Sequence, residues 1–494
     1  MTTTADTTPY QLLIGERWLP AEAGSSYVSD NPYSGQGWAT VPDGGAPDVD
    51  RAVAAARAAL DGPWGAMTGF QRAALMRRLA TVIARDAREL AEIETRDNGK
   101  LLRETLGQVE YLPAWLDYFA GVADKLQGEV IPSDRSNFLI YTRHEPVGVV
   151  GAIVPWNSPL LLLMWKLAPA LAAGCVLVVK PSDYTPVSTL ELGRRILEAG
   201  FPPGVFNVVT GRGPAVGEAL VAHPGVDHIA FTGSTRVGKA VAREAAANLT
   251  RTSLELGGKS AQLVFEDADL EAAANGVIAG IFAATGQSCI AGSRLLVHES
   301  RHDELVQLLC DRAASIALGD PLDPATEMGP LANAGQLRTV TGFVERAISD
   351  GATLACGGGQ SLEDGPLFFQ PTILTDVRAD MEIAREEVFG PVLAVQRFAS
   401  DAQAIEFANG TEYGLAAGVW TRELSRGHRV AHRLRAGTVW VNSYRVVAPN
   451  VPFGGVGSSG WGRESGLESV RSFTETKAIW IELDGLTRDP FRMG

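Results

Sequence analysis

The chain has 494 residues with a formal net charge of −14, and 46% of the residues are hydrophobic and 20% charged. This length exceeds what one ordinary hydrophobic core holds, so it predicts roughly two or three domains of ordinary globular composition. The negative charge argues against nucleic acid as a partner. The 4 cysteines have no paired spacing, which favours reduced thiols in a cytoplasmic protein over a disulfide framework or a metal site: Cys175, Cys289, Cys310 and Cys356.

Two stretches bear on targeting and membrane insertion. The first residues, MTTTADTTPY, are neither basic nor apolar, and we expect a loose tail there. The uncharged stretch over residues 146–165 is interrupted by Pro155, Pro159 and Asn157. Because prolines and a polar amide disfavour a spanning helix, this stretch predicts buried pieces of a soluble core.

The N-terminal part predicts short strands and turns over residues 11–31, followed by surface helices. Apolar residues recur at helical spacing, with polar residues on the other faces. The expected helices begin at residue 48 and continue over 73–84, 87–96 and 106–121. Asn98-Gly99 predicts the end of the helix before it.

Two segments predict a projecting arm. Residues 128–141 read as a hairpin between well-formed segments, and residues 472–483 read as a strand. Trp480 and Ile481 would be exposed on that strand unless it were paired. Arms of this kind often pair with another subunit, so we expect an oligomer.

Between these segments, strands and helices alternate. The strands are near-continuous apolar runs, as in sheets buried on both faces, so the pattern predicts a doubly wound parallel sheet. The ligand of such a sheet lies beyond the carboxyl ends of its strands. The expected strands are 147–154, 175–180, 205–209 and 226–231, and the expected helices are 160–173, 187–199, 216–222 and 235–247. A second α/β unit begins near residue 263, with a helix over 270–284, a strand over 293–297 and a helix over 302–317, and continues to about residue 440.

The segment GQSCIAGSR places Cys289 among small residues, directly after an apolar helical run. A thiolate is a strong nucleophile, and small neighbours leave room for a carbonyl group to approach it. Gly286 and Gly292 allow tight backbone paths on either side. The alternative is a small buried hydrophobic residue, which is what a lone cysteine more often is.

Polar residues follow the predicted sheet strands. In FTGSTRVG, Ser234 is placed to cap a helix whose first amides would face a pyrophosphate; the alternative is an ordinary capped turn. In KPSD, Lys180 and Asp183 could hold ribose hydroxyls; the alternative is a surface loop.

Two further side chains suit the chemistry of a carbonyl group. In ELGGK, Glu255 lies between apolar and glycine neighbours and suits a general base; the alternative is a salt bridge with Lys259. In PWN, the amide of Asn157 could face an oxyanion; the alternative is a buried asparagine that ties down its own loop.

Taken together, these motifs make the chain resemble the NAD(P)-dependent aldehyde dehydrogenase superfamily from about residue 13 to residue 481. The motifs, in family order, are PWN at 155–157, KPSD at 180–183, FTGSTRVG at 231–238, ELGGKS at 255–260, GQSC at 286–289, EEVFGPV at 386–392 and PFGG…SGWGRESG at 452–466. The resemblance implies a doubly wound cofactor domain (residues 1–123 and 147–257), an α/β catalytic domain (258–468) and a small β oligomerisation arm (124–146 and 469–494).

The resemblance also implies residue roles. The nucleophile falls on Cys289, the general base on Glu255 and the oxyanion donor on Asn157, helped by the amide of Cys289, while Lys166 and Glu464 match positions assigned to proton relay. Lys180 and Asp183 would hold the adenosine ribose, Ser234 and Trp156 the pyrophosphate, and Glu387 and Phe389 the nicotinamide ribose. The full cofactor set is Ile153, Pro155, Trp156, Asn157, Lys180, Ser182, Asp183, Gly213, Phe231, Gly233, Ser234, Val237, Leu256, Glu387 and Phe389.

The implied reaction oxidises an aldehyde to the carboxylic acid through a thiohemiacetal and a thioester on Cys289, which water activated by Glu255 hydrolyses. Asp183 replaces the more usual glutamate and is one methylene shorter, so NAD is favoured with NADP as the alternative. Ser158, Ala283 and Val447 stand where many relatives carry aromatic residues, which predicts a roomy tunnel for bulky or cyclic aldehydes. The expected tunnel residues are Ser158, Leu162, Trp165, Ala283, Ser288, Ile290, Val447 and Phe453.

Other readings stay open at this point. Arg445 either favours an acidic or polar substrate at the tunnel mouth or is a solvated surface residue. An acylating relative that passes the acyl group to coenzyme A is the main alternative function, although such enzymes usually lack the base at Glu255. A non-enzymatic member would be free to lose Cys289 and Glu255, and both are present. The resemblance implies a homodimer or homotetramer and no metal.

Overall fold

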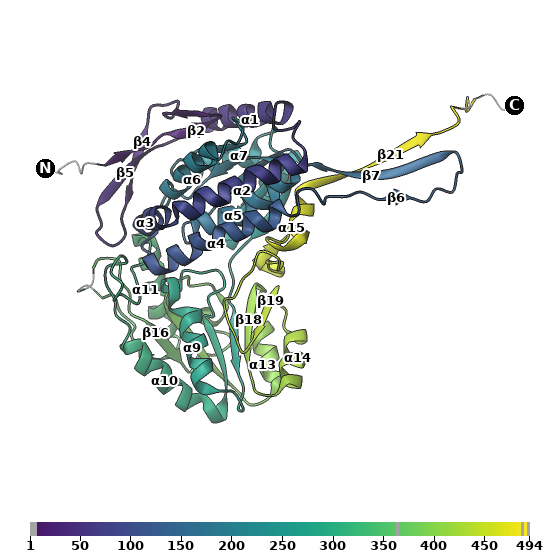
Figure 1. Ribbon diagram of the computed structural model, residues 1–494. Coiled ribbons are helices and arrows are strands. Elements are labelled where there is room, and N and C mark those ends of the chain that lie inside the picture. Colours follow the sequence, from purple (N-terminus) through teal and green to yellow (C-terminus); the bar gives the residue numbers. More distant parts are fainter. Residues whose placement is uncertain (1–6, 362, 364, 486–488, 492–494) are drawn as a thin grey trace.

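The computed structural model describes residues 7–361, 363, 365–485 and 489–491. Two α/β units lie against each other, and a long β arm projects from one side (Figure 1). The beginning of the predicted tail (residues 1–6) and parts of the predicted arm (486–488 and 492–494) lie outside the described residues. Within the described part, no helix combines the length and apolar character needed to cross a membrane.

The first unit is built on a sheet with the strand order β20-β12-β11-β8-β9-β10-β2-β3. Its middle strands, from β12 to β10, are parallel, as predicted, and antiparallel strands flank them. The chain winds outward from β8 in both directions, so the topological switch point lies between β8 and β11. The strands are β2 (Leu12–Ile14), β3 (Arg17–Leu19), β8 (Val149–Ile153), β9 (Val176–Lys180), β10 (Phe206–Val208), β11 (His228–Thr232), β12 (Arg251–Glu255) and β20 (Gly460–Trp461).

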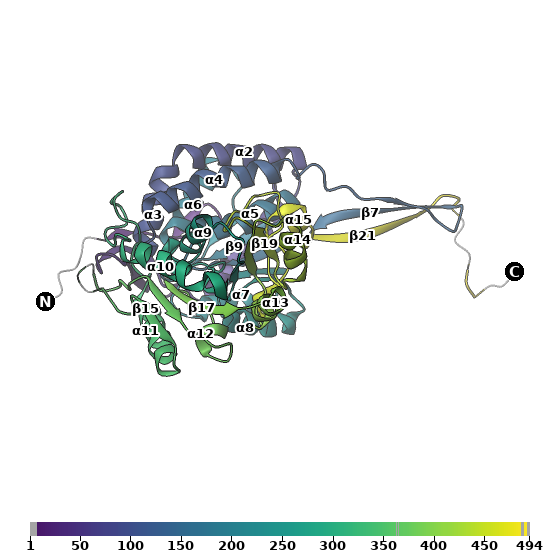
Figure 2. The same ribbon diagram turned by 90° about the horizontal axis from the view of Figure 1, so that it is seen from below.

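The helices cover both faces of this sheet. α5 and α6 pack on one face and α1 and α7 on the other, while α2 and α4 form a further layer over α5 (Figures 1 and 2). Because α5 lies between the sheet and this outer layer, nearly all of its residues are buried, and its first seven residues carry no charge. The helices are α1 (Ala46–Asp61), α2 (Gly69–Arg85), α3 (Ala87–Asn98), α4 (Leu102–Ala120), α5 (Pro159–Ala173), α6 (Val187–Glu198), α7 (Ala215–Ala222), α8 (Thr235–Ala245) and α15 (Gly466–Ser472).

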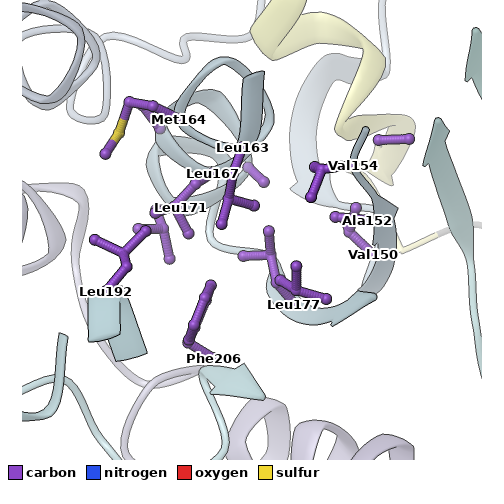
Figure 3. Close-up of a cluster of buried hydrophobic side chains, with 14 of the residues drawn as sticks. Val150, Ala152, Val154, Leu163, Met164, Leu167, Leu171, Leu177, Leu192 and Phe206 are labelled. Atoms are coloured by element: carbon purple, nitrogen blue, oxygen red, sulfur yellow. The ribbon is translucent and has the colours of Figure 1, made fainter. Parts of the chain in front are cut away.

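Figure 3 shows the core between α5 and the sheet. Leu163, Leu167 and Leu171 of α5 point toward Leu177 of β9 and Val150 of β8, and all of them are fully or almost fully buried. Burial of such side chains contributes about 1.5–3 kcal/mol each. This packing holds the carboxyl ends of β8 and β9 in place beneath the loops that follow them.

The second unit has the strand order β15-β16-β17-β14-β13-β18-β19, and all its strands except β15 are parallel. The strands are β13 (Ala261–Val264), β14 (Arg294–His298), β15 (Thr353–Cys356), β16 (Thr372–Thr375), β17 (Val392–Phe398), β18 (Ala416–Trp420) and β19 (Thr438–Val441). The helices are α9 (Leu270–Ile281), α10 (His302–Ala314), α11 (Ala334–Ser349), α12 (Glu382–Arg385), α13 (Asp401–Asn409) and α14 (Leu424–Arg433). A small N-terminal sheet contains β1 (Thr8–Pro9), β4 (Ser26–Asp30) and β5 (Gly37–Pro42).

The arm has the strand order β21-β7-β6, with β6 (Val130–Ile131), β7 (Phe138–Pro146) and β21 (Thr474–Glu482). The C-terminal strand β21 pairs along the whole of β7, which continues beyond the predicted hairpin (128–141) to Pro146 (Figure 1). Trp480 stacks edge-on against Phe138, yet it is 56% exposed. The strand prediction is confirmed, and the division into domains stays a prediction.

Two predicted helix ends are wrong. The helix expected over 270–284 ends at Ile281, because Ala284 and Thr285 take left-handed backbone conformations (φ 53° and 56°). The helix expected over 302–317 ends at Ala314, because Ala317 turns to donate its N–H to Glu327 and Leu318 bridges to Met328. Contacts with residues distant in sequence determine both helix ends, and helical periodicity does not predict such contacts.

Candidate active site

The carboxyl edge of the first sheet meets the second unit at a cavity of about 230 Å³. Loops that follow β8, β11 and β12 line one side, and the nucleophile loop and the segment after α12 line the other. The lining residues are Pro155, Trp156, Asn157, Leu162, Thr232, Gly233, Ser234, Glu255, Leu256, Gly257, Cys289, Gln336, Thr339, Glu387, Val388 and Phe389. Side chains predicted for catalysis and for cofactor binding therefore share one cavity.

Cys289 reaches this cavity by a tight turn at residues 284–286. Three consecutive residues, Ala284, Thr285 and Gly286, have positive φ, which costs about 1–2 kcal/mol for each residue that carries a Cβ. Partners hold the turn: the carboxylate of Glu104 accepts the N–H of Ala284 (2.9 Å), and the hydroxyl of Thr285 donates to a backbone carbonyl (3.0 Å). A Cβ at Gly286 would stand 2.1 Å from the carbonyl oxygen of Gly390, so this glycine is required.

Asn157 lies against the same loop. Its side-chain Nδ2 donates a hydrogen bond to the carbonyl oxygen of Gln287 (3.0 Å), two residues before Cys289. The amide group has a second N–H, which leaves one donor for another acceptor. The asparagine therefore ties down the nucleophile loop rather than its own, which the sequence reading did not foresee.

Glu255 is a buried carboxylate without a hydrogen bond. Neither oxygen has a partner among the described residues, and the side chain is 4% exposed. Burial first, and the nearby carboxylate of Glu464 second, raise its pKa well above the ordinary value, against the lowering effect of Lys166. The alternative salt bridge with Lys259 is not formed, since the Lys259 ammonium also lacks a partner in the described chain.

Lys166 and Glu464 form a buried ion pair, and Lys166 also donates to the hydroxyl of Thr232 (2.5 Å). Burial raises the pKa of Glu464, and Lys166 opposes that rise. Both members of the pair act on the pKa of Glu255 through their charges, and their assignment to a proton relay stays a prediction.

The surroundings of Cys289 disfavour its thiolate form. Burial raises its pKa to about 12, with further increases from the carboxylates of Glu387 and Glu255. The ordinary pKa of a cysteine is about 8.5. The carboxyl groups of Glu387, Glu255 and Glu464 therefore disfavour the thiolate until a positive charge or a bound carbonyl group stabilises it.

The first turn of α8 has the features of an anion-binding helix N-terminus. Ser234 is the N-cap, and its hydroxyl accepts the N–H of Val237 (3.4 Å), as predicted. Gly233 precedes it, and a Cβ there would meet the ring of Phe231 at 2.6 Å. The remaining amides of this first turn are available to a phosphate group.

The residues predicted for the adenosine ribose lie apart from this cavity, at the end of β9. Lys180 is buried, so the surface-loop alternative does not hold. Asp183 accepts the N–H of Gly213 (3.2 Å), which joins two predicted cofactor residues. The Ser182 hydroxyl accepts the N–H of Tyr184 (3.3 Å) and is used within its own loop.

Unlike the residues at the end of β9, Glu387 and Phe389 line the cavity. The carboxylate of Glu387 accepts the N–H of Gly258 (3.0 Å), and Phe389 stacks edge-on against Trp156 (5.1 Å) from a left-handed backbone conformation (φ 58°). A Cβ at Gly257 would stand 2.1 Å from Glu387, which explains the first glycine after Leu256. The start of α8, the carboxylate of Glu387 and the rings of Trp156 and Phe389 together fit a dinucleotide.

Sequence reasoning missed Gln336 and Thr339 in the first turns of α11. The side-chain amide of Gln336 donates to the carbonyl oxygens of Val388 (2.8 Å) and Phe389 (2.9 Å), so it holds the strained segment that presents Glu387. The only local signal is Asn333, which caps α11 and accepts the N–H of Gln336. That signal predicts a helix start and nothing about the site.

The predicted tunnel walls belong to the core of the first unit. Trp165 stacks on Trp115 (5.9 Å) and on Phe453 (4.9 Å), and Leu162, Ile290 and Val447 pack in the same cluster as Cys289. Ala283 and Ser288 are half-buried beside the nucleophile loop. Ile153 and Val237 lie at the carboxyl end of β8 and in α8 and do not line the cavity.

Comparison with known proteins agrees with this geometry. The chain matches the model of the aldehyde dehydrogenase family over residues 18–479. It is 46% identical over 487 residues to (Z)-2-((N-methylformamido)methylene)-5-hydroxybutyrolactone dehydrogenase of Acinetobacter baylyi, covering 98% of this chain and 99% of that protein.

Solved structures give the same answer. The NAD+ complex of aldehyde dehydrogenase from Bacillus cereus has a TM-score of 0.94 and 44% identity, covering 96% of this chain and 97% of the other. Betaine aldehyde dehydrogenase from Staphylococcus aureus, in complex with NAD+, has a TM-score of 0.96 and 39% identity, covering 98% and 97%. The chain therefore belongs to the aldehyde dehydrogenase family and is an oxidoreductase that acts on aldehydes.

Proposed function

We propose that the protein oxidises an aldehyde to its carboxylic acid with NAD+, through a thioester on Cys289 that water hydrolyses. One observation carries the proposal. An unpartnered buried carboxylate (Glu255), an amide with a free donor (Asn157) and a thiol (Cys289) line one cavity, next to the side chains that suit a nicotinamide ribose. The two similar solved structures that contain NAD+ support the choice of cofactor.

In the first step, the thiol of Cys289 loses its proton to solvent water, its sulfur adds to the carbonyl carbon, a C–S bond forms, the C=O double bond becomes a single bond and the oxygen takes the negative charge. The free N–H of Asn157 and the backbone N–H of Cys289 stabilise that charge, and each donor is worth about 3 kcal/mol. Because Asn157 is anchored on the nucleophile loop, donor and nucleophile keep a fixed relation.

When bound, the nicotinamide would supply a positively charged ring that accepts a hydride. The former aldehyde C–H bond breaks, the hydrogen leaves with its electron pair, the C=O double bond re-forms, and a thioester remains on Cys289. Ser234 and the start of α8 would hold the pyrophosphate, Glu387 and Phe389 would hold the nicotinamide end, and Lys180 and Asp183 would hold the adenosine ribose. Glu255 then takes a proton from water, the oxygen of that water attacks the thioester, and the C–S bond breaks to release the acid and the thiolate.

Variants of Cys289 and Glu255 should separate the oxidation step from the hydrolysis step. We expect Cys289→Ala to abolish formation of NADH. Glu255→Gln should still form about one NADH per active site in a rapid burst and then turn over about 10²–10⁴-fold more slowly, because only hydrolysis needs the base. Rapid mixing with absorbance detection measures both phases. Acid that forms only when coenzyme A is added, or steady turnover by Cys289→Ala, would contradict the proposal and favour the acylating alternative or another nucleophile.

The pKa of Cys289 predicts how it reacts with iodoacetamide in the absence of ligands. Only the thiolate reacts, so the alkylation rate should rise about 10-fold per pH unit from pH 7 to pH 10, without a plateau. Mass spectrometry of the peptide that contains Cys289 gives the rate, and glutathione, whose rate levels off near its own pKa, is the control. A plateau of the Cys289 rate below pH 9 would show that burial and the surrounding carboxylates do not suppress ionisation.

The charge of Glu464 affects the pH above which Glu255 acts as a base. The base works when deprotonated, so the hydrolysis-limited kcat should rise with pH through the raised pKa of Glu255. Glu464→Gln removes a negative charge that raises this pKa and leaves the charge of Lys166, so the rising limb should move to lower pH. The exposed Glu468→Gln is the matched control. A limb that stays in place or moves to higher pH argues against this electrostatic coupling.

We further propose NAD over NADP, a roomy tunnel for bulky or cyclic aldehydes, and subunit pairing through the arm. Ser158, Ala283 and Val447 are small residues at the tunnel, and the Acinetobacter relative is named for a substrate with a ring. The exposed apolar side chains of the arm suit pairing with another subunit in a homodimer or homotetramer.

A panel of acetaldehyde, hexanal, benzaldehyde and cyclohexanecarboxaldehyde, each assayed with NAD+ and with NADP+, tests the first two proposals. We expect higher kcat/KM for the cyclic and aromatic members and for NAD+, because Asp183 repels a 2′-phosphate. A far higher kcat/KM for acetaldehyde than for any ring-bearing aldehyde would refute the roomy tunnel. Equal use of both cofactors would refute the role of Asp183.

A further inference from the structure

A second cavity, of about 260 Å³, lies between the start of α4 and the segment that precedes α11. One wall consists of residues 101–103 and 106, the other consists of residues 321–324 and 326, and Arg88 of α3 completes the lining. The walls are joined where the N–H of Leu102 donates to the carbonyl oxygen of Pro321 (2.9 Å). In the described chain, this cavity shares no lining residue with the cavity at Cys289, so the two are separate.

Most of the lining of the second cavity is apolar. Both walls contribute leucine or proline side chains, namely Leu101, Leu102, Leu106, Pro321, Leu322 and Pro324. Leu322 is 39% exposed, and Leu102 and Leu106 are half-buried, so apolar surface remains in contact with water here. A ligand with an alkyl chain would gain free energy by covering that surface.

The polar part of the lining includes an unpaired cation. Arg103 is exposed and forms no ion pair in the part of the chain that the structure describes, and its guanidinium donates to the carbonyl oxygen of Glu327 (3.5 Å). Arg88 is paired with Glu92 (2.9 Å), and the carboxylate of Asp323 accepts an N–H of its own turn (2.8 Å). The charge that remains for a ligand is therefore positive, which favours an anion.

Both walls also hold the turn that leads to Cys289. Glu104, in the first turn of α4, accepts the N–H of Ala284 (2.9 Å). The carbonyl oxygen of Gly329, which follows the opposite wall closely in sequence, accepts the hydroxyl hydrogen of Thr285 (3.0 Å). Two adjacent residues of the left-handed turn are therefore bonded to opposite sides of the second cavity, and a change in the distance between its walls acts on the turn.

We propose that the second cavity binds an aliphatic carboxylate as an effector, and that its occupancy restrains the loop of Cys289. The alkyl chain packs on the leucine and proline side chains of both walls, and the guanidinium of Arg103 donates to the carboxylate oxygens in charge-assisted hydrogen bonds. A ligand that contacts both walls favours the arrangement in which they are close, which is the arrangement that holds the turn. This inference goes beyond the proposed oxidation and does not rest on it, because neither binding nor restraint requires turnover.

Isothermal titration calorimetry with octanoate tests the binding. Octan-1-ol keeps the alkyl chain and lacks the charge, and acetate keeps the charge and lacks the chain. Octanoate should bind at least about 10-fold more tightly than either compound, because only octanoate uses both the apolar walls and the cation.

Two variants locate that binding. Arg103→Met should weaken the binding of octanoate about 10-fold, because it removes the charged donor. Leu322→Asp should abolish binding, because it places a like charge among the apolar side chains. Both side chains are exposed, so neither change should disturb the fold, and Arg77→Met, which replaces an exposed arginine of α2, is the matched control and should bind as the wild type does.

The rate at which iodoacetamide alkylates Cys289 tests the restraint. Motion of the loop gives the reagent access to the sulfur, so saturating octanoate should slow alkylation at pH 9 at least about 3-fold in the wild type and in Arg77→Met, and not in Leu322→Asp. Mass spectrometry of the peptide that contains Cys289 measures the rate.

Three results would overturn the inference, and each leaves the proposed oxidation standing. The first is octanoate that binds no more tightly than octan-1-ol, or that binds both variants as tightly as the wild type. The second is binding that leaves the alkylation rate unchanged. The third is a slowing that persists in Leu322→Asp, as direct binding beside Cys289 would give.

Discussion

The site depends on one backbone constraint, the left-handed turn at residues 284–286. Without this turn, α9 would continue, and the thiol that follows it would remain with the second unit instead of facing the carboxyl edge of the first sheet. The turn is held from both units, by Glu104 of α4 and by the close approach of Gly390 to Gly286. Each contact is modest, about 1 kcal/mol for a hydrogen bond, but together they fix which cavity Cys289 enters.

Around that thiol the protein concentrates negative charge. Glu255 and Glu464 are buried and Glu387 is half-buried, and one ion pair, Lys166 with Glu464, offsets part of that charge. The consequence is that the pKa of the Cys289 thiol and the pKa of the Glu255 carboxyl are both raised above their ordinary values. Such a site gains most from ligands that bring positive charge or accept negative charge, which a cationic ring and a carbonyl group respectively do.

The sequence predicts the fold class, the residues that form the central parallel strands and the main side chains of the cavity. Motifs that follow parallel strands all lie at the same edge of the sheet, so their side chains come together there. Ser234 caps its helix as its pattern requires, and Glu255 lies free of Lys259. The sequence does not predict the end of α9, the anchoring of Asn157 on the nucleophile loop, or the contact of Gln336 with the segment before Gly390. Each of these depends on a contact between segments far apart in the chain. Local sequence periodicity carries no information about such contacts. The second cavity is missed for the same reason, since only the fold brings its two walls together.

The claim that matters most is that the acyl group is carried on the sulfur of Cys289 and waits there for Glu255. Glu255→Gln protein mixed with NAD+ and an excess of hexanal, quenched in acid and digested, should carry a hexanoyl group on the peptide that contains Cys289, and mass spectrometry measures its mass and position. An acyl group on another residue, or hexanoate formed at the wild-type rate with no acylated peptide at any time, would contradict the account.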